Sequence, residues 1–407
     1  MTTDTAPPPT TAAGRRLLVL LIAMASVGPL SVNIIIPAIP GLALSLKADP
    51  AAVQLTISLF FAGLATAQLV LGALSDRFGR RPVLLTGFLI TVITSFAAAA
   101  ATGIASLVVA RTLQAFGAST GIVIGRAIVR DLYSRDRAAS MLGWVTMSTV
   151  VIPMFGPLIG GLLDEWWGWR SIFIFVGCSA LVVVVWAMVS LPETRPPQAA
   201  AAMSFRQLGK ESRALLSTPA FAGFALCAGM ISGPYYAMLG AAPQVVITQM
   251  GRSPAELGLW FMLSSLGYML GNYIAGRFSA RFGIYAMIWW GLVLEFAGTA
   301  AGVALVPLAD TLGPLAIFAP ITVIFVANGI ALPSAIAGAV SVRPQAAGTA
   351  SGVAGFAQMG CGALISQLMT YPMAGATTAM PMTIAMLAIA IAGLAIYWLL
   401  IRPYRVS

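Results

Sequence analysis

The amino-acid sequence predicts an all-α membrane protein with twelve transmembrane helices, arranged as two pseudo-symmetric six-helix halves. Of its 407 residues, 59% are hydrophobic and only 8% are charged, whereas a soluble domain carries about 25% charged residues. A water-soluble fold of this size could not cover its surface with so few charges, so lipid must be the solvent. A β-barrel is excluded because its strands alternate polar and apolar residues. Helices remain as the way to satisfy the backbone in lipid.

The expected spans follow from the stretches that contain no Asp, Glu, Lys or Arg. Each is at least as long as the about 20 residues that a helix needs to cross a bilayer. These stretches are 17–46, 50–75, 82–110, 138–163, 171–192, 214–251, 257–276, 311–342 and 344–401. The last is long enough for two crossings, with a turn at 371–381 that contains glycine and proline. Two further spans carry charges inside, at about 104–129 and about 284–306, which completes the twelve.

The domain organisation follows from composition along the chain. Arg15 and Arg16 precede an apolar stretch that is too long for the core of a signal peptide, so we interpret this stretch as the first span. Proline, alanine and mixed charges after the sixth span indicate a linker. The expected segments are a disordered cytoplasmic tail (1–14), an N-terminal six-helix bundle (15–192), a cytoplasmic linker (193–218), a C-terminal six-helix bundle (219–401) and a cytoplasmic tail (402–407).

The distribution of basic residues predicts the orientation. When twelve spans are threaded from a cytoplasmic amino terminus, most of the 22 Lys and Arg residues fall in the inner segments, and only Lys47, Arg170 and Arg252 fall outside. The positive-inside rule therefore predicts that both termini are cytoplasmic. The net charge of +10 is spread over seven short inner segments, which indicates contact with lipid headgroups rather than with nucleic acid.

Catalytic and metal-binding residue patterns are absent from the sequence. Histidine does not occur, and Cys178, Cys227 and Cys361 are isolated within separate expected spans. No metal-ligand spacing or converging catalytic set is present. We therefore expect no metal, no cofactor and no enzymatic activity.

The two halves share a short repeat. Ser-Asp-Arg-Phe-Gly at 75–79 follows the second span, and Ser-Ala-Arg-Phe-Gly at 279–283 follows the eighth. The two copies lie half a chain length apart, in equivalent loops. Duplicated six-helix halves are one of the architectures of membrane transporters.

Four motifs now identify a family. The stretch 72–82 (Gly-Ala-Leu-Ser-Asp-Arg-Phe-Gly-Arg-Arg-Pro) resembles the loop signature of the major facilitator superfamily, and 111–118, 156–161 and 191–194 resemble further motifs of that family. The stretches 53–56, 126–131 and 229–234, with Gln68, are similar to the bicyclomycin/chloramphenicol-resistance (Bcr/CflA) branch of drug:proton antiporters. The resemblance implies a monomeric transporter of the bacterial inner membrane. It would export small amphipathic drugs or metabolites by alternating access, in exchange for protons.

The resemblance implies a conformational latch at the inner end of the first half. Asp76 would lie near the amino-terminal end of a helix from the other half and near an arginine, and Gly72 would allow close helix approach. A simple positive anchor is the alternative reading of the loop. Ala280 in the second copy carries no charge, so the latch would be one-sided. The implied inner-gate residues are Gly72, Asp76, Arg77, Gly79, Arg80, Arg81, Arg126, Arg130 and Asp131.

The fifth span contains the stretch that resembles the antiporter motif, with Gly156, Pro157, Gly160 and Gly161. The proline removes a helix hydrogen bond and the glycines allow tight packing. This composition suits a helix face that moves against the opposite half. Ordinary packing of small residues is the alternative.

Four polar residues inside spans are candidates for substrate or proton coupling: Asn33, Arg111, Gln114 and Glu295. Arg111 should face the bundle interior, with Gln114 on the same helix face; a structural hydrogen bond to carbonyls is the alternative role. Asn33 stands where the related branch commonly has Asp, which favours an uncoupled or differently coupled carrier as the alternative function. Glu295 is the one acid central to a span, and it either couples protons or bonds a neighbouring helix.

The cavity that the resemblance implies would lie between the halves. Aromatic and methionine side chains give adaptable apolar contacts to varied ligands, although core packing is equally compatible with each position. The candidate lining residues are Phe60, Met147, Tyr235, Tyr236, Gln244, Tyr268, Asn272, Asn328 and Gln358.

Overall fold

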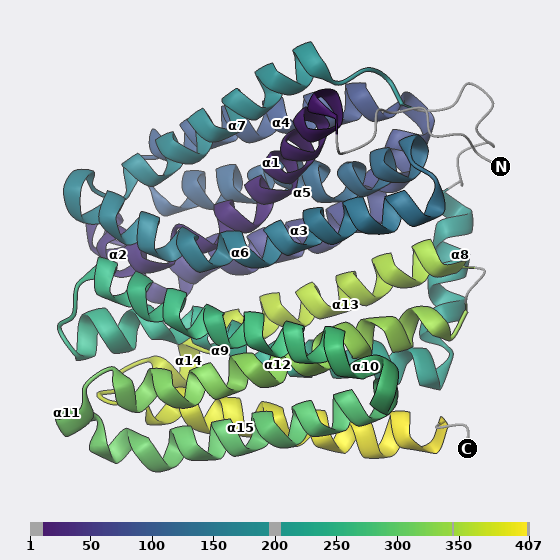
Figure 1. Cartoon of the computed structure of the whole chain (residues 1–407). Coiled ribbons are helices and arrows are strands. Elements are labelled where there is room, and N and C mark those ends of the chain that lie inside the picture. The colour runs from purple at the N-terminus through teal and green to yellow at the C-terminus, as the bar shows by residue number, and fades with distance from the viewer. Residues whose placement is uncertain (1–10, 195–204, 344–345, 405–407) are drawn as a thin grey trace.

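The computed structural model describes residues 11–194, 205–343 and 346–404, and these residues form helices and turns without strands (Figure 1). The first half comprises α1 (Ala12–Asn33), α2 (Ile39–Leu46), α3 (Pro50–Phe78), α4 (Arg80–Ala99), α5 (Ile104–Leu132), α6 (Arg135–Trp167) and α7 (Arg170–Ser190). The second half comprises α9 (Pro219–Pro243), α10 (Pro254–Leu305), α11 (Ala309–Leu312), α12 (Leu315–Ser341), α13 (Ala347–Leu368), α14 (Thr370–Met373) and α15 (Met380–Ile396). A helix α8 (Phe205–Leu216) lies between the halves in the sequence.

Twelve of these helical arms are long enough to cross a bilayer. Nine segments of the described chain combine helix length with high hydropathy, and one of them contains both arms of α10. The helices α6 and α13, of 33 and 22 residues, complete the set. The prediction of twelve helices in two halves is confirmed.

The two halves lie side by side, with α1 to α7 in one and α9 to α15 in the other (Figure 1). The start of α1, the helix α8 and the end of the last helix lie at one end of the bundle, which we call the terminal face. The short helices α2, α11 and α14 lie at the opposite end, which we call the distal face.

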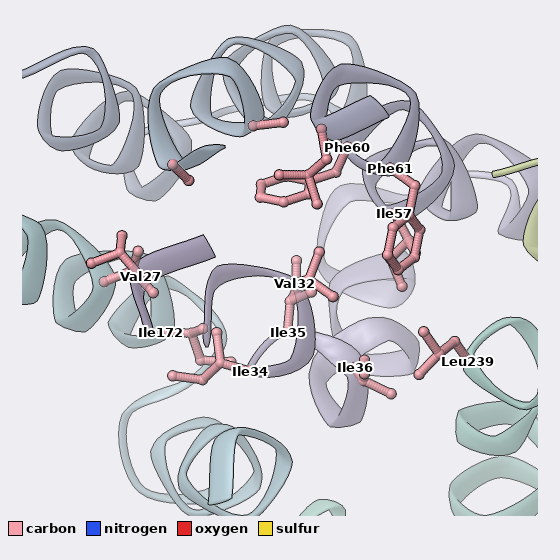
Figure 2. Packing of buried hydrophobic residues seen from close by; sticks show 14 of the residues in the cluster. Val27, Val32, Ile34, Ile35, Ile36, Ile57, Phe60, Phe61, Ile172 and Leu239 are labelled. Carbon is pink, nitrogen blue, oxygen red and sulfur yellow. The ribbon is translucent and has the colours of Figure 1, made fainter. Parts of the chain in front are cut away.

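Apolar side chains occupy both the interior and the outer surface of the bundle. Ile35 and Phe60 are fully buried, and Figure 2 shows Ile36 of the first half beside Leu239 of α9. In contrast, Val182 on α7 and Leu364 on α13 are 65% and 66% exposed. Such an exposed apolar surface is favourable only in contact with lipid. The protein is therefore a multi-pass membrane protein.

The repeated loop adopts the same backbone conformation in both halves. Gly79 ends α3 with φ 98° and ψ 153°, and Gly283 divides α10 with φ 77° and ψ 162°. Residues with a Cβ rarely adopt this region, whereas glycine does so at no steric cost. In both copies, moreover, the arginine lies over the following phenylalanine ring at 5.3 Å, as Arg77 over Phe78 and Arg281 over Phe282.

The segment boundaries differ in detail from the expected ones. The helix α1 begins at Ala12, before the expected start at 15, and residues 1–10 of the expected tail lie outside the described residues. The expected linker contains α8, while its residues 195–204 are outside the described part. A short helical turn, Arg402–Tyr404, occupies the start of the expected C-terminal tail.

Candidate functional site

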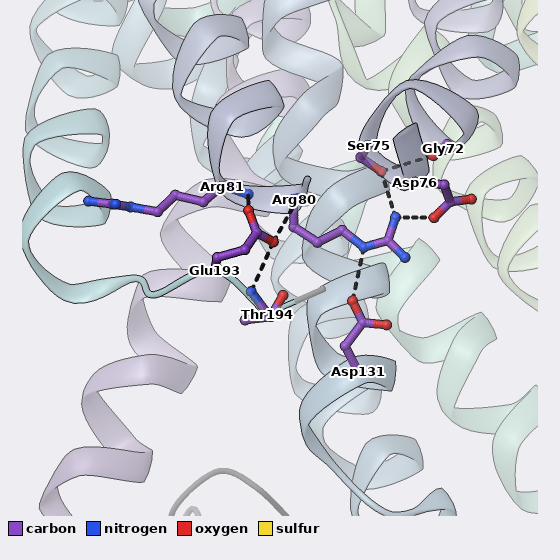
Figure 3. Close-up of polar contacts among 8 residues, drawn as sticks. All are labelled: Gly72, Ser75, Asp76, Arg80, Arg81, Asp131, Glu193 and Thr194. Carbon is purple, nitrogen blue, oxygen red and sulfur yellow. Dashed lines mark hydrogen bonds and ion pairs between the residues drawn. The ribbon is translucent and has the colours of Figure 1, made fainter. Parts of the chain in front are cut away.

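A charge network occupies the terminal face of the first half (Figure 3). Arg80, at the start of α4, forms an ion pair with Asp76 at the end of α3. Its Nε donates to Oδ2 of Asp131 on α5 at 2.9 Å, and its Nη1 donates to the Ser75 hydroxyl at 2.7 Å. The Arg80 guanidinium thus links α3, α4 and α5 of the same half. Hydrogen bonds in which the donor or acceptor is charged are stronger than those between neutral groups.

Glu193 closes this network from the segment that follows α7. Its carboxylate accepts from the backbone N–H of Arg80 at 2.9 Å and of Arg81 at 3.2 Å. These two N–H groups lie in the first turn of α4 and therefore have no hydrogen-bond acceptor within the helix. A negative charge at this position also interacts favourably with the helix dipole. Arg81 in turn donates to the Met188 carbonyl at 2.8 Å. Glu193 was not among the site residues expected from the sequence, although the motif at 191–194 contains it.

The implied inner gate is only partly assembled in this structure. Asp76 pairs with Arg80 of its own half, not with a helix of the other half. Arg126 and Arg130 are exposed, and neither forms an ion pair with a carboxylate of the described chain. The close approach expected at Gly72 is not present, since a Cβ built there would meet no atom within 4 Å.

The glycine face of α6 makes the close helix contacts instead. A Cβ at Gly160 would fall on the Ile34 carbonyl oxygen, and Gly156 lies against Asn33. A Cβ at Gly161 would lie 2.4 Å from the Pro254 carbonyl oxygen of the other half. Gly258 of α10 approaches the backbone at Pro157 and Leu158 equally closely. This set therefore packs α6 against both α1 and the opposite half.

Polar contacts near the distal face also join the halves. Glu165, at the end of α6, accepts from the backbone N–H of Ala255 in the first turn of α10 at 2.9 Å. Near the start of α3, Gln54 donates to Ser366 of α13, and Ser58 donates to Gln367 at 2.7 Å. A carboxylate at a helix amino terminus is favourable, so Glu165 stabilises this contact between the halves near the distal face. Glu165 was not among the residues expected from the sequence.

Arg111 is sealed inside the first half. Its side chain is 1% exposed and lies 4.1 Å from the Phe60 ring centroid. Nη1 donates to the Ser31 carbonyl at 2.9 Å and to Gln114 Oε1 at 2.6 Å, and Gln114 donates to the Ser95 hydroxyl. Arg111 and Gln114 share a helix face, as expected, but both are enclosed by their own half.

Asn33 meets the second half directly. Its Oδ1 accepts from the Tyr235 hydroxyl of α9 at 2.7 Å, and its Nδ2 donates to the Pro29 carbonyl at 2.9 Å. Both residues line a cavity of about 180 Å³. Some polar groups around it are bonded within the second half: Gln358 donates to the Ser232 hydroxyl at 2.8 Å, and Asn328 donates to the Ile231 carbonyl at 3.0 Å.

The cavity contains about half of the residues expected to line it. From the expected set, Tyr235, Tyr236, Tyr268, Asn328 and Gln358 line it, together with Asn33. Six further residues line the cavity that were not expected from the sequence: Thr149, Ser232, Phe261, Ser265, Phe325 and Leu332.

The other expected lining residues lie elsewhere. Phe60 packs against Arg111, Gln244 donates to the Met373 carbonyl at 2.9 Å, and Asn272 donates to the Tyr268 carbonyl at 2.8 Å. The Met147 side chain lies outside the described part of the chain.

Glu295 lies in the second arm of α10 and is completely buried. Gly291 and Gly298, one turn away on either side, pack against α12. Neither carboxyl oxygen has a hydrogen-bond partner among the described residues, so the bond to a neighbouring helix that the structural alternative requires is not made. Glu295 does not line the cavity either.

A family model described as Major Facilitator Superfamily matches residues 21–366. The chain belongs to this superfamily. The superfamily consists of membrane transporters, so the expectation of a transporter rather than an enzyme is confirmed. The fold is similar to that of a bacterial homologue of the human lysosomal transporter Spinster, in an inward-facing and unoccupied conformation, with a TM-score of 0.75 at 16% identity. The likeness covers 97% of this chain and 98% of that one.

The names of two proteins that are similar to this chain describe drug resistance. Multidrug resistance protein D of Escherichia coli is 30% identical over 370 residues, which is 88% of this chain and 89% of the relative. The chloramphenicol resistance protein of Pseudomonas aeruginosa is 30% identical over 331 residues, which is 81% and 77% of the two chains. The resemblance to the drug-resistance branch is confirmed.

Proposed function

We propose that this protein is a secondary active transporter that exports small amphipathic drugs or metabolites by alternating access, in exchange for protons. The observation that carries the proposal is the cavity lined by both halves, through Asn33 and Thr149 of the first and ten residues of the second. A site at the interface of two six-helix repeats can open to either side as the halves rock. The names of the drug-resistance relatives support export. One chain supplies both halves, so the transporter acts as a monomer.

Basic residues support the orientation needed for export. Arg80, Arg81, Arg126 and Arg130 lie toward the terminal face, which the positive-inside rule assigns to the cytoplasm of a bacterial inner membrane. The distal face is then external. In this state the halves are joined near the external side by Glu165 and by the pairs between α3 and α13. Release of substrate to the outside requires these contacts to break.

The experiment uses inside-out vesicles from a bacterium that lacks its own drug pumps and expresses this protein. A pH indicator is enclosed, the lumen is acidified by respiration, and chloramphenicol is added outside. Export corresponds to uptake into these vesicles, so proton exchange predicts a chloramphenicol-dependent rise in luminal pH. Uptake of labelled chloramphenicol without that rise would reject proton exchange, and a lack of uptake for this and a wider compound panel would reject the transporter.

An uncoupled or differently coupled carrier of a small metabolite is the second candidate. It is favoured by Asn33, an amide that carries no proton in the physiological range, and by the lack of any charged residue among those that line the cavity. Transport that continues unchanged after an ionophore collapses the pH gradient supports this candidate.

Glu295 separates the two candidates further. If it carries the coupled proton, Glu295→Gln abolishes uphill transport but leaves downhill exchange intact. The matched variant Glu256→Gln changes a partly exposed carboxylate near the distal face and should leave both activities within about twofold of the parent. Retained uphill transport in Glu295→Gln shows that Glu295 is not the proton carrier.

A further inference from the structure

Two cavities meet at the hydrogen bond between Asn33 and Tyr235. The first is the cavity of about 180 Å³ described above. The second, of about 160 Å³, lies mainly in the first half, where Val32, Leu64 and Val123 line it. The residues common to both are Asn33, Tyr235 and Tyr236. We call the two spaces the C-half and the N-half compartment, after the halves that supply most of their walls.

The compartments differ in chemistry. The C-half compartment presents hydroxyl and amide groups from Thr149, Ser232, Ser265, Asn328 and Gln358. The N-half compartment is mainly aliphatic and aromatic, with Gln68 and Ser119 as its polar members besides the shared residues. One compartment therefore suits a group that makes hydrogen bonds, and the other suits an apolar group.

Among the residues that the structure describes, no charged side chain lines either compartment. Arg111, deep in the first half, is enclosed by Ser31, Gln114 and Phe60 and is 1% exposed. A ligand with a net charge would lose its hydration without gaining a counter-charge, and this uncompensated desolvation disfavours its binding. A net-neutral ligand avoids this cost.

The hydrogen bond between Asn33 and Tyr235 lies where the two compartments meet, and we call this pair of residues the divider. Sites for small molecules typically enclose about 300–1,000 Å³, and each compartment alone is smaller than that range, whereas the two together reach it. Both divider groups can bond a ligand once they separate, because Asn33 Oδ1 accepts and the Tyr235 hydroxyl can donate and accept. Neither group needs to change its charge for the divider to open.

We propose that the two compartments form one site for a net-neutral amphipathic molecule, which replaces the Asn33–Tyr235 hydrogen bond with its own. The apolar part of the ligand occupies the N-half compartment, and its hydrogen-bonding part occupies the C-half compartment. The inference rests on the proposed transport function, whose substrate class it specifies. Asn33 and Tyr235 are then specificity-determining residues.

The charge preference is tested by binding of three probes to the purified protein in equilibrium dialysis. The probes are chloramphenicol, which is neutral, its anionic hemisuccinate, and an analogue in which a trimethylammonium group replaces the dichloroacetamide. The neutral probe should bind at least tenfold more tightly than either ion. Equal binding of a charged probe, or no measurable binding of the neutral one, would overturn the proposal.

Asn33→Asp places a carboxylate at the divider. It should shift the ratio of neutral to cationic affinity by at least tenfold toward the cation. The matched variant Asn272→Asp lies outside both compartments and should leave the ratio unchanged. An unchanged ratio in Asn33→Asp, in protein that still binds chloramphenicol, also contradicts the assignment.

The two-compartment arrangement is tested by protection of single cysteines from alkylation. Val123→Cys reports the N-half compartment and Ser265→Cys the C-half compartment, each in a chain whose native cysteines are replaced by alanine. Saturating chloramphenicol should slow the alkylation of both by at least fivefold, while Leu44→Cys, 81% exposed on α2, should be unaffected. Protection of only one position would overturn the shared site.

These measurements separate the inference from the proposed function. Neutral-selective binding that protects both cysteines, without transport in vesicles, contradicts the transport function alone. Transport of chloramphenicol by a protein that binds the charged probes equally well contradicts the inference alone.

Discussion

The two copies of the repeated loop have the same backbone turn but different charges around it. At Gly79, the turn lies between Asp76, Arg80 and Glu193, which are joined by ion pairs and hydrogen bonds. At Gly283, the second copy has Ala280 in place of the acid, and no atom lies within 4 Å of where a Cβ would be. Both glycines nevertheless have positive φ and similar ψ.

The comparison shows that the charges are not needed to form the turn. Glycine alone permits this conformation in the second copy. The charged cluster of the first copy is therefore available for another role, and in the proposed transport cycle this role is in the movement of the halves. Asp76 contacts its own half here, so in that proposal a contact with the other half belongs to a different state of the cycle.

The largest effect is expected for Asp76→Asn. The amide cannot form the ion pair with Arg80 or a charged contact with the other half, so drug transport in vesicles should fall at least tenfold. Asp310→Asn, on the short helix α11 at the opposite face, serves as the matched control and should stay within twofold. Normal transport by Asp76→Asn would show that the cluster is only a positive anchor.

Ala280→Asp tests whether the difference in charge between the two copies of the loop matters for transport. It introduces an acid at the equivalent position of the second copy, where no carboxylate contact is built. We expect that it does not restore transport to Asp76→Asn when the two changes are combined. Restoration would show that the acid can act from either half and that the latch is not one-sided.

A smaller effect is expected for alanine at the two glycines. A residue with a Cβ in this region of positive φ and ψ near 150–160°, which only glycine adopts readily, costs about 1–3 kcal/mol, and this cost applies to Gly79→Ala and Gly283→Ala alike. At Gly79 the new Cβ would also lie 2.6 Å from the Glu193 carboxylate and displace it. The thermal midpoint of the purified protein in detergent should therefore fall further for Gly79→Ala. Equal midpoints would show that Glu193 moves aside without loss.

The smallest effect is expected for Glu193→Gln. The change keeps a hydrogen-bond acceptor but removes the negative charge at the start of α4, which contributes about 0.3–1 kcal/mol at an exposed site. The thermal midpoint should fall slightly at low salt, and the difference from the parent should shrink as salt screens the charge. A difference that does not depend on salt would mean that hydrogen-bond geometry, not charge, determines the effect.

Several features of the site could be predicted from local sequence. Arg111 and Gln114 are three residues apart on a helix, so their contact followed from helix geometry. The repeat predicted that 75–79 and 279–283 occupy equivalent places in the two halves, and the structure shows the same glycine conformation in both. Glu193 could not be assigned in the same way, because it caps a helix whose first residue lies 113 positions earlier in the chain. Glu165 likewise meets a backbone N–H that is 90 positions away.

The sequence by itself determined that the protein lies in lipid, how many times the chain crosses the membrane and to which superfamily it belongs. Hydropathy, span length and motifs can be determined from the sequence alone because they are properties of contiguous residues. Only the tertiary structure decided which polar groups meet. Asn33 and Tyr235 are 202 positions apart, and nothing in either neighbourhood indicates that one donates to the other. The same holds for Arg111, which the sequence placed inside the bundle. Whether it faces a ligand or the carbonyls of its own half depends on how α1, α3 and α5 pack around it.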